Sequence, residues 1–389
     1  MDPGRYQRHA FGEVRRTPGR HGYWAFHPAS LPRRMALGAE TAVLLGEAES
    51  ALGRLDGISQ LLPNPDLLVR PYLVREAVAS TRIEGTRASI AEVYDADVSD
   101  AGLTPDMEEV VNYVRATEHA VGRLADLPLS MRLVREAHEI LLDGVRGRDK
   151  QPGQVRTTQN WIGSATSTID TATYVPPPPD VMGAALDDWE RFVNDESTAL
   201  PVLAQCALMH YQFEAIHPFL DGNGRVGRLL IVLFLIDRGR LARPVLYVSP
   251  YLERRRDSYI GHLQAIHEHG DPDPWIGFFC QAVADQAGDA VRRARRLVEL
   301  REDYRRRVPA QANAQALVDV LFATPVLTSR LVEQHLDVTR PTSLRLLQQF
   351  ATAGVLAPRP QGHAGSTVGR PTTSCTLSPT TPDRAAPTA

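Results

Sequence analysis

Residues 217–228, with the sequence HPFLDGNGRVGR, bring several chemically capable side chains together in one short stretch. His217 is the only one of them whose ordinary pKa lies near neutrality, so it is the candidate general base. Asp221 is a hard oxygen ligand that suits a magnesium ion already held by phosphates. Asn223 offers an amide that can hold phosphate oxygens. The residue types therefore indicate a nucleoside polyphosphate beside a base.

The elements around this stretch would position it. The apolar run Leu229–Ile236 predicts a buried helix that begins beside these residues. Gly222 and Gly224 let the backbone approach a ligand, and the amides at a helix start lack partners, so we expect an anion site. Arg225 and Arg228 lie three residues apart and so share one helix face, where they can neutralise phosphate charge. For any one of these residues, a structural role in a glycine-rich helix cap is the alternative.

The stretch resembles the signature of the Fic family, HPFx(D/E)GNGRxxR, at every defined position. The resemblance implies an all-helical fold, with a short β-hairpin flap, that transfers AMP from ATP to a hydroxyl side chain of a protein and releases pyrophosphate. It implies that His217 deprotonates the target hydroxyl and that Asp221 holds Mg2+. The residues expected to bind the phosphates are Gly222, Asn223, Gly224, Arg225 and Arg228. One relative with phosphotransfer activity has lysine at the position of Gly224, so the glycine favours nucleotidyl transfer.

A second pattern lies near the end of a helix that we predict to begin at Pro71 and to end at Gly85. Ser80 and Glu84 are spaced i and i+4, which alone predicts only a polar helix face. Beside the signature, however, this segment resembles the inhibitory motif (S/T)xxxE(G/N), whose glutamate pairs with the second arginine of the signature, here Arg228. Such a pair would occupy space that ATP needs. We therefore expect Glu84 to hold the enzyme in a low-activity state, either within one chain or across a homodimer.

Two further regions receive roles through the resemblance. The polar segment from residue 153 to a run of four prolines at 176–179 favours a short hairpin with a rigid exit. The resemblance assigns it to the flap that binds the target as an added strand; an ordinary surface hairpin is the alternative. Tyr251 and Tyr259 lie where the family builds its adenine pocket, and plain core packing is the alternative for both. The flap residues expected to contact the target are Asn160, Trp161, Ile162 and Gly163.

Composition narrows the remaining possibilities. The net charge of −3 over 389 residues gives no whole-chain argument for binding nucleic acid or membranes. The three cysteines have no CxxC spacing, so no disulfide framework is expected and a reducing cytoplasm is the simpler inference. Residues 1–20 lack an apolar segment, and the run after Arg228 is far too short to cross a bilayer, so we expect neither a signal peptide nor a spanning helix.

The C-terminal part predicts a separate unit of three helices followed by a small β-wing, formed by Val355–Leu356 and Cys375–Leu377. By pattern only, it resembles the winged helix-turn-helix module found at the C-terminus of some Fic proteins. Its recognition helix would carry Arg340, Thr342, Ser343 and Arg345 and would contact DNA. A protein-contact module is an equal alternative.

The predicted organisation follows the chain in order: an extended arm (1–30), a helical region with the inhibitory motif (31–115), the Fic core (116–285), a linking helix (286–307), the winged-helix-like unit (308–377) and a disordered tail (378–389). Residues 36–62 predict one long helix or two short ones. The main functional interpretation is an autoinhibited protein adenylyltransferase that uses ATP and Mg2+. The alternatives are a Fic-fold enzyme that transfers another nucleotide group or removes AMP, and a nucleotide-sensing DNA-binding regulator.

Overall fold

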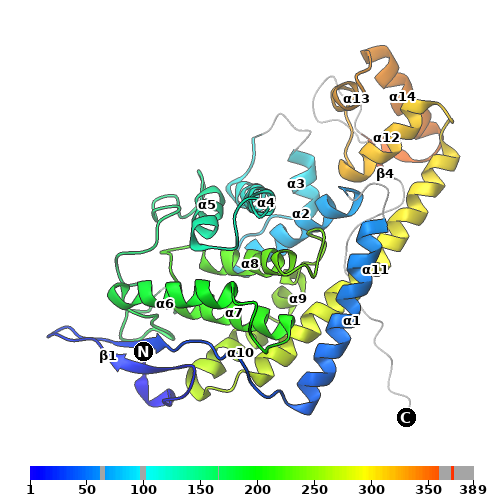
Figure 1. Cartoon of the computed structure of the whole chain (residues 1–389). Coiled ribbons are helices and arrows are strands. Elements are labelled where there is room, and N and C mark those ends of the chain that lie inside the picture. The colour runs from blue at the N-terminus through cyan, green and yellow to red at the C-terminus, as the bar shows by residue number, and fades with distance from the viewer. Residues whose placement is uncertain (62–65, 97–101, 165, 359–368, 372–389) are drawn as a thin grey trace, which may run out of the picture. The chain divides into compact units, whose positions relative to one another are not determined.

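The computed structural model describes residues 1–61, 66–96, 102–164, 166–358 and 369–371 (Figure 1). Within these residues the protein is mainly helical, with two small antiparallel sheets, which confirms the predicted fold class. The chain forms two compact units. The first contains Met1–Val93 and Ala101–Arg296, and the second contains Tyr94–Asp100 and Leu297–Ala389.

Two neighbouring helices form the centre of the first unit. α7 (Val202–Ile216) and α8 (Asn223–Asp237) lie side by side, and most of their residues are buried (Figure 1). Both helices carry apolar side chains on all their faces, as expected for helices that are covered on all sides. Residues 217–222 join them in a short loop. The loop therefore places His217 and the start of α8 at one end of this buried pair.

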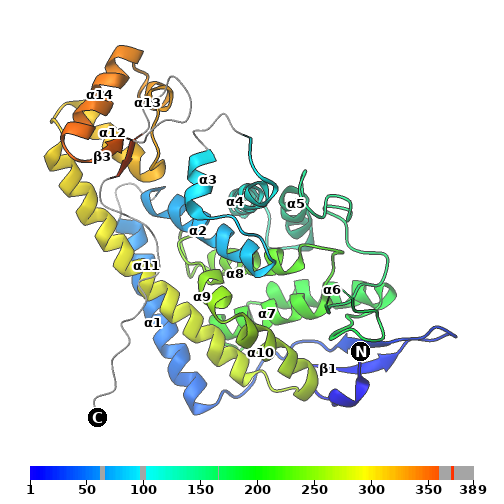
Figure 2. The same ribbon diagram turned by 180° about the vertical axis from the view of Figure 1, so that it is seen from behind.

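Other helices cover the central pair. α6 (Pro179–Val193) packs on α7, while α4 (Pro105–Arg123) and α5 (Met131–Leu141) pack on each other and on α8. α2 (Asp66–Ile83) contacts α4, α8 and α9 (Ser249–Arg254), and Figure 2 shows it from the side of α9. The end of α2 thereby reaches the start of α8.

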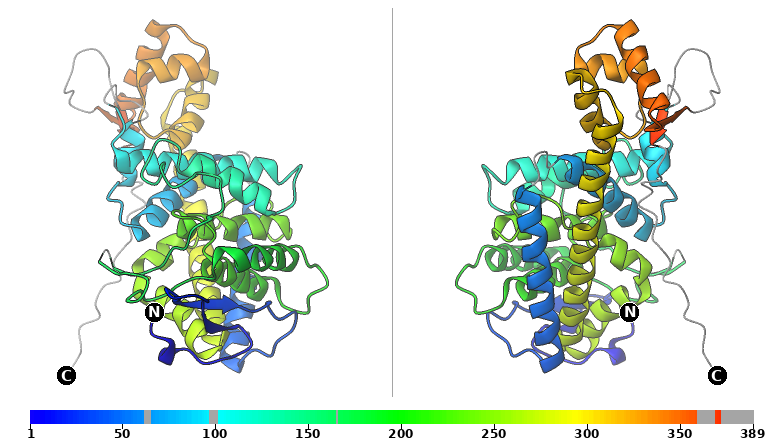
Figure 3. Two further views of the ribbon diagram at one scale, coloured as in Figure 1. Left: turned by 90° about the vertical axis from the view of Figure 1, so that its left-hand side faces the viewer. Right: turned by 90° about the vertical axis from the view of Figure 1, so that its right-hand side faces the viewer.

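Long helices complete the first unit. α1 (Ala39–Leu61) is a single helix, which decides between the two predicted alternatives, and it runs beside the N-terminal part of α11 (Asp273–Arg307) (Figure 3). The amide of Gly38 donates to Asp273 at 2.8 Å and ties the two helix starts together. α10 (Arg256–His269) precedes α11. The sequence predicts a helix over 273–283 before the linking helix 286–307, but the two are one continuous helix, since no proline separates them.

Three local predictions were wrong. Pro71 lies inside α2, beyond its first turn, rather than at its start. Acidic and turn-forming residues over 88–104 predict a connection between helices, but the segment contains the short helix α3 (Ile90–Ala96). The predicted extended arm contains the 3-10 turn η1 (Pro3–Arg5) and a hairpin of two strands. These strands are β1 (Gly12–Arg16) and β2 (Trp24–Pro28), with Val14 opposite Phe26.

The second unit contains the three predicted helices, α12 (Ala312–Ala323), α13 (Ser329–Leu336) and α14 (Arg340–Thr352). β3 (Leu356–Pro358) pairs antiparallel with β4 (Gly369–Pro371). The predicted second wing strand, Cys375–Leu377, and the predicted tail, 378–389, lie outside the described residues.

One predicted recognition residue does not face solvent. Ser343 is fully buried, and its hydroxyl oxygen lies 3.2 Å from Glu333 Oε1 and 2.9 Å from the Arg340 carbonyl oxygen, two acceptors for its one hydrogen. It therefore joins α14 to α13 instead of lining an exposed face, whereas Arg340 and Arg345 are exposed. The helical period explains the error, because Ser343 lies on the side of α14 that carries the buried Leu347.

Among the described residues, none of the helices combines the length and the apolar content that a membrane crossing requires.

Candidate active site

The loop between α7 and α8 has an unusual backbone at both ends. His217 caps α7 in the left-handed region, with φ 49° and ψ 59°, which is uncommon for a residue with a side chain. Gly222 caps the start of α8 with φ 80°. The first amide that bonds within α8 is that of Val226, which donates to the Gly222 carbonyl at 3.0 Å. The amides of Asn223, Gly224 and Arg225 thus have no partner inside the helix, as the predicted anion site requires.

Asn223 has a different role from the predicted one. Its side-chain oxygen accepts from the Phe219 amide at 2.8 Å, and its nitrogen donates to the Phe219 carbonyl at 2.8 Å. The residue is 2% exposed. Because both polar groups are used by the loop itself, the side chain holds the loop in shape, and only the backbone amide of Asn223 is available to a phosphate.

His138 on α5 supports the same loop, and the sequence analysis missed it. Its ring stacks on Phe219, with centroids 3.8 Å apart and 7° between the planes. The Gly153 amide donates to Nδ1 at 2.8 Å, so Nε2 carries the hydrogen that is donated to the Asp221 carbonyl at 3.0 Å. Burial lowers the pKa of His138 to about 4, which keeps this tautomer neutral. The residue thus fixes the loop directly before the anion site and ties it to Gly153.

Arg156 supports the other end of the loop, at the C-terminus of α7. It is 1% exposed and donates to the carbonyls of His217 at 3.0 Å, Pro177 at 2.6 Å and Ile216 at 3.4 Å. A cation is favourable at a helix C-terminus, where carbonyls lack partners. This buried guanidinium therefore holds His217 in its left-handed conformation.

His217 is neutral at pH 7 in this environment. Burial lowers its pKa to about 4, and the positive charge of Arg156 acts in the same direction. The partial negative charge at the C-terminus of α7 would favour the protonated ring, but burial outweighs it. A neutral imidazole can accept a proton, as the predicted base must.

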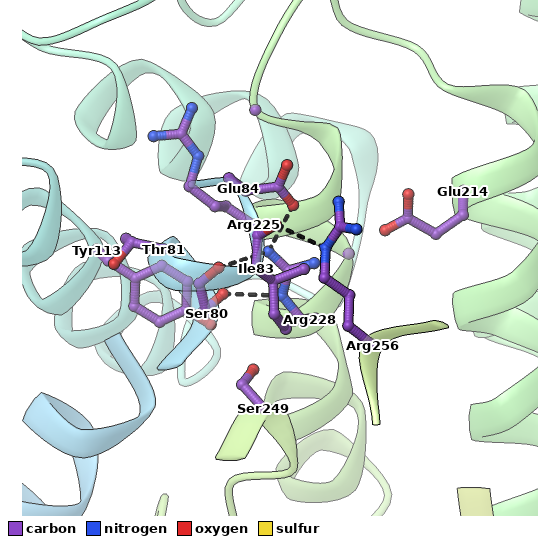
Figure 4. A network of polar contacts seen from close by, with 12 residues as sticks. Ser80, Thr81, Ile83, Glu84, Tyr113, Glu214, Arg225, Arg228, Ser249 and Arg256 are labelled. Carbon is purple, nitrogen blue, oxygen red and sulfur yellow. Dashed lines mark hydrogen bonds and ion pairs between the residues drawn. The ribbon is translucent and has the colours of Figure 1, made fainter. Parts of the chain in front are cut away.

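Glu84 and Arg228 form the predicted ion pair within one chain, with 2.8 Å between Oε1 and Nη2 (Figure 4). Ser80 completes the contact, because its hydroxyl accepts from Nε and its carbonyl accepts from Nη2, both at 2.9 Å. Arg228 is 2% exposed and Ser80 is fully buried. The guanidinium charge lowers the pKa of Glu84 even though burial opposes this. The Nε and Nη2 donors of Arg228 are thus both engaged by Ser80 and Glu84.

The Glu84 carboxylate also occupies the anion site. A Cβ at Gly224 would collide with Glu84 Oε1 and would lie 2.9 Å from Arg228 Nη1. Gly224 belongs to the first turn of α8, where an anion is stabilised by the helix dipole and by free amides. A phosphate at this turn and the Glu84 carboxylate therefore exclude each other.

Arg225 pairs with a carboxylate that the sequence analysis did not identify. Its Nη1 lies 2.9 Å from Glu109 Oε2 on α4, and its Nη2 lies 3.4 Å from Asp221 Oδ1. Asp221 is 36% exposed, and its Oδ1 accepts from the Gly222 amide at 2.6 Å. The described residues contain no cluster of three or more metal-binding side chains. A single accessible carboxylate nevertheless fits Mg2+, which takes its other ligands from phosphates and water.

Glu76 anchors α2 one turn before Ser80. It is 2% exposed and accepts from the Ser249 amide at 3.0 Å, from the Ser249 hydroxyl, and from the Tyr113 hydroxyl at 3.3 Å. Burial raises its pKa to about 7. The contact joins α2 to both α9 and α4.

Glu214 lies one turn before His217 and points toward the arginines from α7 (Figure 4). Its Oε2 is 4.0 Å from His217 Nδ1, and its buried Oε1 has no hydrogen-bond partner among the described residues. Burial raises the pKa of Glu214 to about 7. The space for this side chain depends on Gly227, because a Cβ there would collide with Glu214 Oε1.

Gly227→Ala is therefore expected to destabilise the protein by about 1–3 kcal/mol, the usual cost of overpacking a buried site. Gly261→Ala is the matched control, since a Cβ at that helical glycine meets nothing within 4 Å. Urea unfolding of both variants measures the difference in free energy. An unchanged midpoint for Gly227→Ala would show that Glu214 moves aside without cost.

Within the part of the predicted flap that the structure describes, a single antiparallel bridge joins Ile162 and Tyr174. Trp161 and Ile162 are 44% and 40% exposed, and Gly163 beside them is exposed as well. Asn160 instead faces the loop and donates to the Phe219 carbonyl at 2.8 Å. A target-binding role for these residues stays a prediction, and Asn160 has a second role in supporting the loop.

The environments of Tyr251 and Tyr259 favour the packing alternative. Tyr259 is 4% exposed, and its hydroxyl lies 2.8 Å from His210 Nε2. Tyr251 is 3% exposed, and the guanidinium of Arg255 lies 4.1 Å above its ring. Neither ring offers an exposed face. The predicted adenine contact is thus not visible in this arrangement.

Residues 42–122 match the family described as Fic/DOC family N-terminal, and residues 128–235 match the Fic/DOC family. The chain thus contains a Fic/DOC family domain over residues 128–235, preceded by the N-terminal domain of the same family. A protein adenylyltransferase fic-1 of Caenorhabditis briggsae is 33% identical over 117 residues, which cover 28% of this chain and 21% of that protein. A protein adenylyltransferase Fic of Drosophila grimshawi is 27% identical over 176 residues, which cover 44% of this chain and 31% of that protein.

A solved structure shares the fold. The Fic family protein from Desulfovibrio desulfuricans G20 superposes with a TM-score of 0.58 at 22% identity and covers 88% of this chain and 98% of its own. The matched segments span less than a third of the two relatives named adenylyltransferases.

Proposed function

We propose that the protein is an adenylyltransferase that transfers AMP from ATP to a hydroxyl side chain of a protein and releases pyrophosphate, and that Glu84 restrains it. The observation that carries this proposal is the anion site at the start of α8, which lies beside a neutral histidine and is occupied by a carboxylate. Relatives that are named adenylyltransferases support the activity.

In the proposed reaction the amides at the start of α8 and the two arginines bind the phosphates of ATP. His217 accepts the proton of the incoming hydroxyl as its oxygen bonds to the α-phosphorus, and the bond to pyrophosphate breaks. Asp221 would hold Mg2+, which would neutralise charge on the phosphates when bound. Arg156 and His138 keep the loop fixed, so that His217 stays aligned during the reaction.

The same geometry explains the proposed restraint. Arg228 cannot contact an outer phosphate while Glu84 and Ser80 hold its guanidinium. Glu84 is 36% exposed, so its carboxylate can leave the anion site without passing through the core. The contact lies within one chain, and the restraint proposed here therefore needs no partner subunit.

Intact-mass analysis tests the reaction. After incubation with ATP and Mg2+, the protein is expected to gain the mass of one or more AMP groups by modifying itself, and pyrophosphate should appear in solution. ATP labelled on the α-phosphorus should label protein, whereas ATP labelled on the γ-phosphorus should not. Label from the γ-position would instead show phosphotransfer, and removal of AMP from a modified protein would support the alternative reaction.

The acid side of the pH profile tests the state of His217. Since its pKa is lowered to about 4, its base form is present above that pH and is lost only as the pH falls through it. We therefore expect kcat/KM for AMP transfer by a Glu84→Gly variant to show no loss between pH 7 and pH 5. Glu214→Gln is the control, because it removes another group that titrates near this range. A midpoint near 6.5 that persists in this control would contradict the buried, neutral histidine.

The second unit supports a separate proposal, contact with DNA through α14. A tight turn at Asp337, with φ 49°, joins α13 to α14, and Arg340 and Arg345 are exposed on α14. A gel shift of the full chain, compared with an Arg340→Ala and Arg345→Ala double variant, tests it. Equal binding by both proteins, or none, would leave the protein-contact alternative.

A further inference from the structure

Glu109 joins three parts of the site, and neither sequence motif includes it. Its carboxylate is 4% exposed and pairs with Arg225, which is 1% exposed, at 2.9 Å. The same oxygen lies 3.3 Å from Nη2 of Arg146, and that nitrogen also donates to the Glu84 carbonyl at 3.3 Å. One buried carboxylate on α4 thus holds an arginine of α8 and a second arginine that caps the end of α2.

Glu109 does not resemble Glu84 as a restraint. Glu84 is 36% exposed and lies against Gly224 in the anion site. Glu109 lies against neither glycine of the site, because the side chains nearest to Gly222 are those of His138 and Leu142. A restraint has to leave its arginine before the nucleotide binds. Separating the pair would leave Glu109 with only its 3.3 Å contact to Arg146 and Arg225 with only its 3.4 Å contact to Asp221, which is strongly unfavourable for two buried charges. Glu109 is therefore built to stay in place when the nucleotide enters.

The pair with Glu109 uses only some of the hydrogen-bond donors of Arg225. Glu109 takes Nη1, while Nη2 makes only a longer contact of 3.4 Å with Asp221. Nε is buried and has no partner among the described residues. A guanidinium has five N–H donors in a fixed fork, so the edge that Glu109 leaves free can serve a phosphate. Glu109 also limits how closely Arg225 can approach Asp221.

We propose that Glu109 is a positioning residue for ATP and Mg2+: it fixes Arg225 so that its free edge meets the phosphates and so that Asp221 stays available to the metal. This inference rests on the proposed function. Without the Glu109 charge, Arg225 would turn to Asp221, the nearest remaining carboxylate. That closer pair would compete with Mg2+ for the Asp221 oxygens and would misalign the phosphate contact.

Glu109→Gln, made in a Glu84→Gly parent, tests the proposal by calorimetry of ATP binding at a series of Mg2+ concentrations. We expect the Mg2+ concentration for half-maximal ATP binding to rise about tenfold, the usual loss when the partner of a metal-site residue is removed. The kcat/KM of AMP transfer should fall in parallel. Glu108→Gln is the matched control: this half-buried neighbour on α4 carries the same charge but is not one of the carboxylates that contact Arg225, so both values should stay unchanged.

An unchanged Mg2+ dependence of ATP binding would overturn the proposal, and so would a rise in transfer rate, which would make Glu109 a second restraint. Glutamine keeps the shape and an acceptor oxygen, and thermal unfolding checks that the variant folds. If it does not, Glu109→Asp keeps the charge but shortens the side chain, and a smaller shift in the same direction is expected. A parent that binds ATP but transfers no AMP would refute the proposed function alone, because the binding measurement still tests Glu109.

Discussion

Glu84→Gly is expected to raise the rate of AMP transfer about 10- to 100-fold. The variant removes the carboxylate from the anion site and frees Arg228, whose charge-assisted hydrogen bonds to Glu84 contribute about 1.5–3 kcal/mol. Each 1.4 kcal/mol corresponds to a factor of ten. ATP then meets an open helix start and a guanidinium that has lost its carboxylate partner and keeps only the Ser80 oxygens. Incorporation of α-labelled AMP into the protein, measured against time for both forms, gives the ratio directly.

Two companion variants distinguish the effect of the Glu84 charge from the effect of its side-chain volume. Glu84→Gln keeps the side-chain volume over Gly224 but loses the charge, so it should give a smaller increase than Glu84→Gly. Ser80→Ala removes one acceptor from Arg228 and leaves the Ser80 carbonyl in place, so it should have little effect. Equal rates for the unaltered protein and for Glu84→Gly would refute the restraint.

His217→Ala, made in the Glu84→Gly parent, should lower the transfer rate by about 10²–10⁴-fold, the usual contribution of a general base. The imidazole is not one of the groups that hold the phosphates, so ATP binding should stay within about threefold of the parent. Measuring both quantities distinguishes a lost base from a collapsed site. His269→Ala is the control, because that histidine is exposed at the end of α10.

Transfer that persists in His217→Ala would remove this residue from the base role. Glu214 would then be the nearest remaining candidate, because its carboxylate lies 4.0 Å from the imidazole and its pKa is raised to about 7. The Glu214→Gln variant already named for the pH profile separates these two cases.

The features that the sequence predicted best lie within one short stretch of chain, where the same residues supply both the backbone and the side chains of the site. Residues 217–228 predicted a loop followed by a buried helix, and the helix begins at Asn223 as this requires. The pairing of Glu84 with Arg228 was predicted only through resemblance to a family motif. Spacing along the chain carries no information about which helices meet.

The missed residues act across long distances in the chain or through the backbone. Glu109 lies 116 positions from Arg225 and sits in an acidic helix turn that reads as a solvated surface. His138 and Arg156 bind carbonyl oxygens, which every residue provides, so no pattern marks their partners. Asn223 was assigned to phosphate because its side chain can bind one; the bonds to Phe219 show that the loop uses those groups first.

The anchoring of α2 by Glu76 limits how the protein can become active. A wholesale departure of α2 would strip a buried carboxylate of its Ser249 and Tyr113 donors, and it would open the interfaces with α4 and α9. Glu84 lies beyond the last helical residue, Ile83, and the next residue, Gly85, adopts φ 101°. The restraint proposed for Glu84 can therefore be released by fraying of this terminal turn alone, and a ligand that captures the residues around Gly85 is expected to raise the transfer rate.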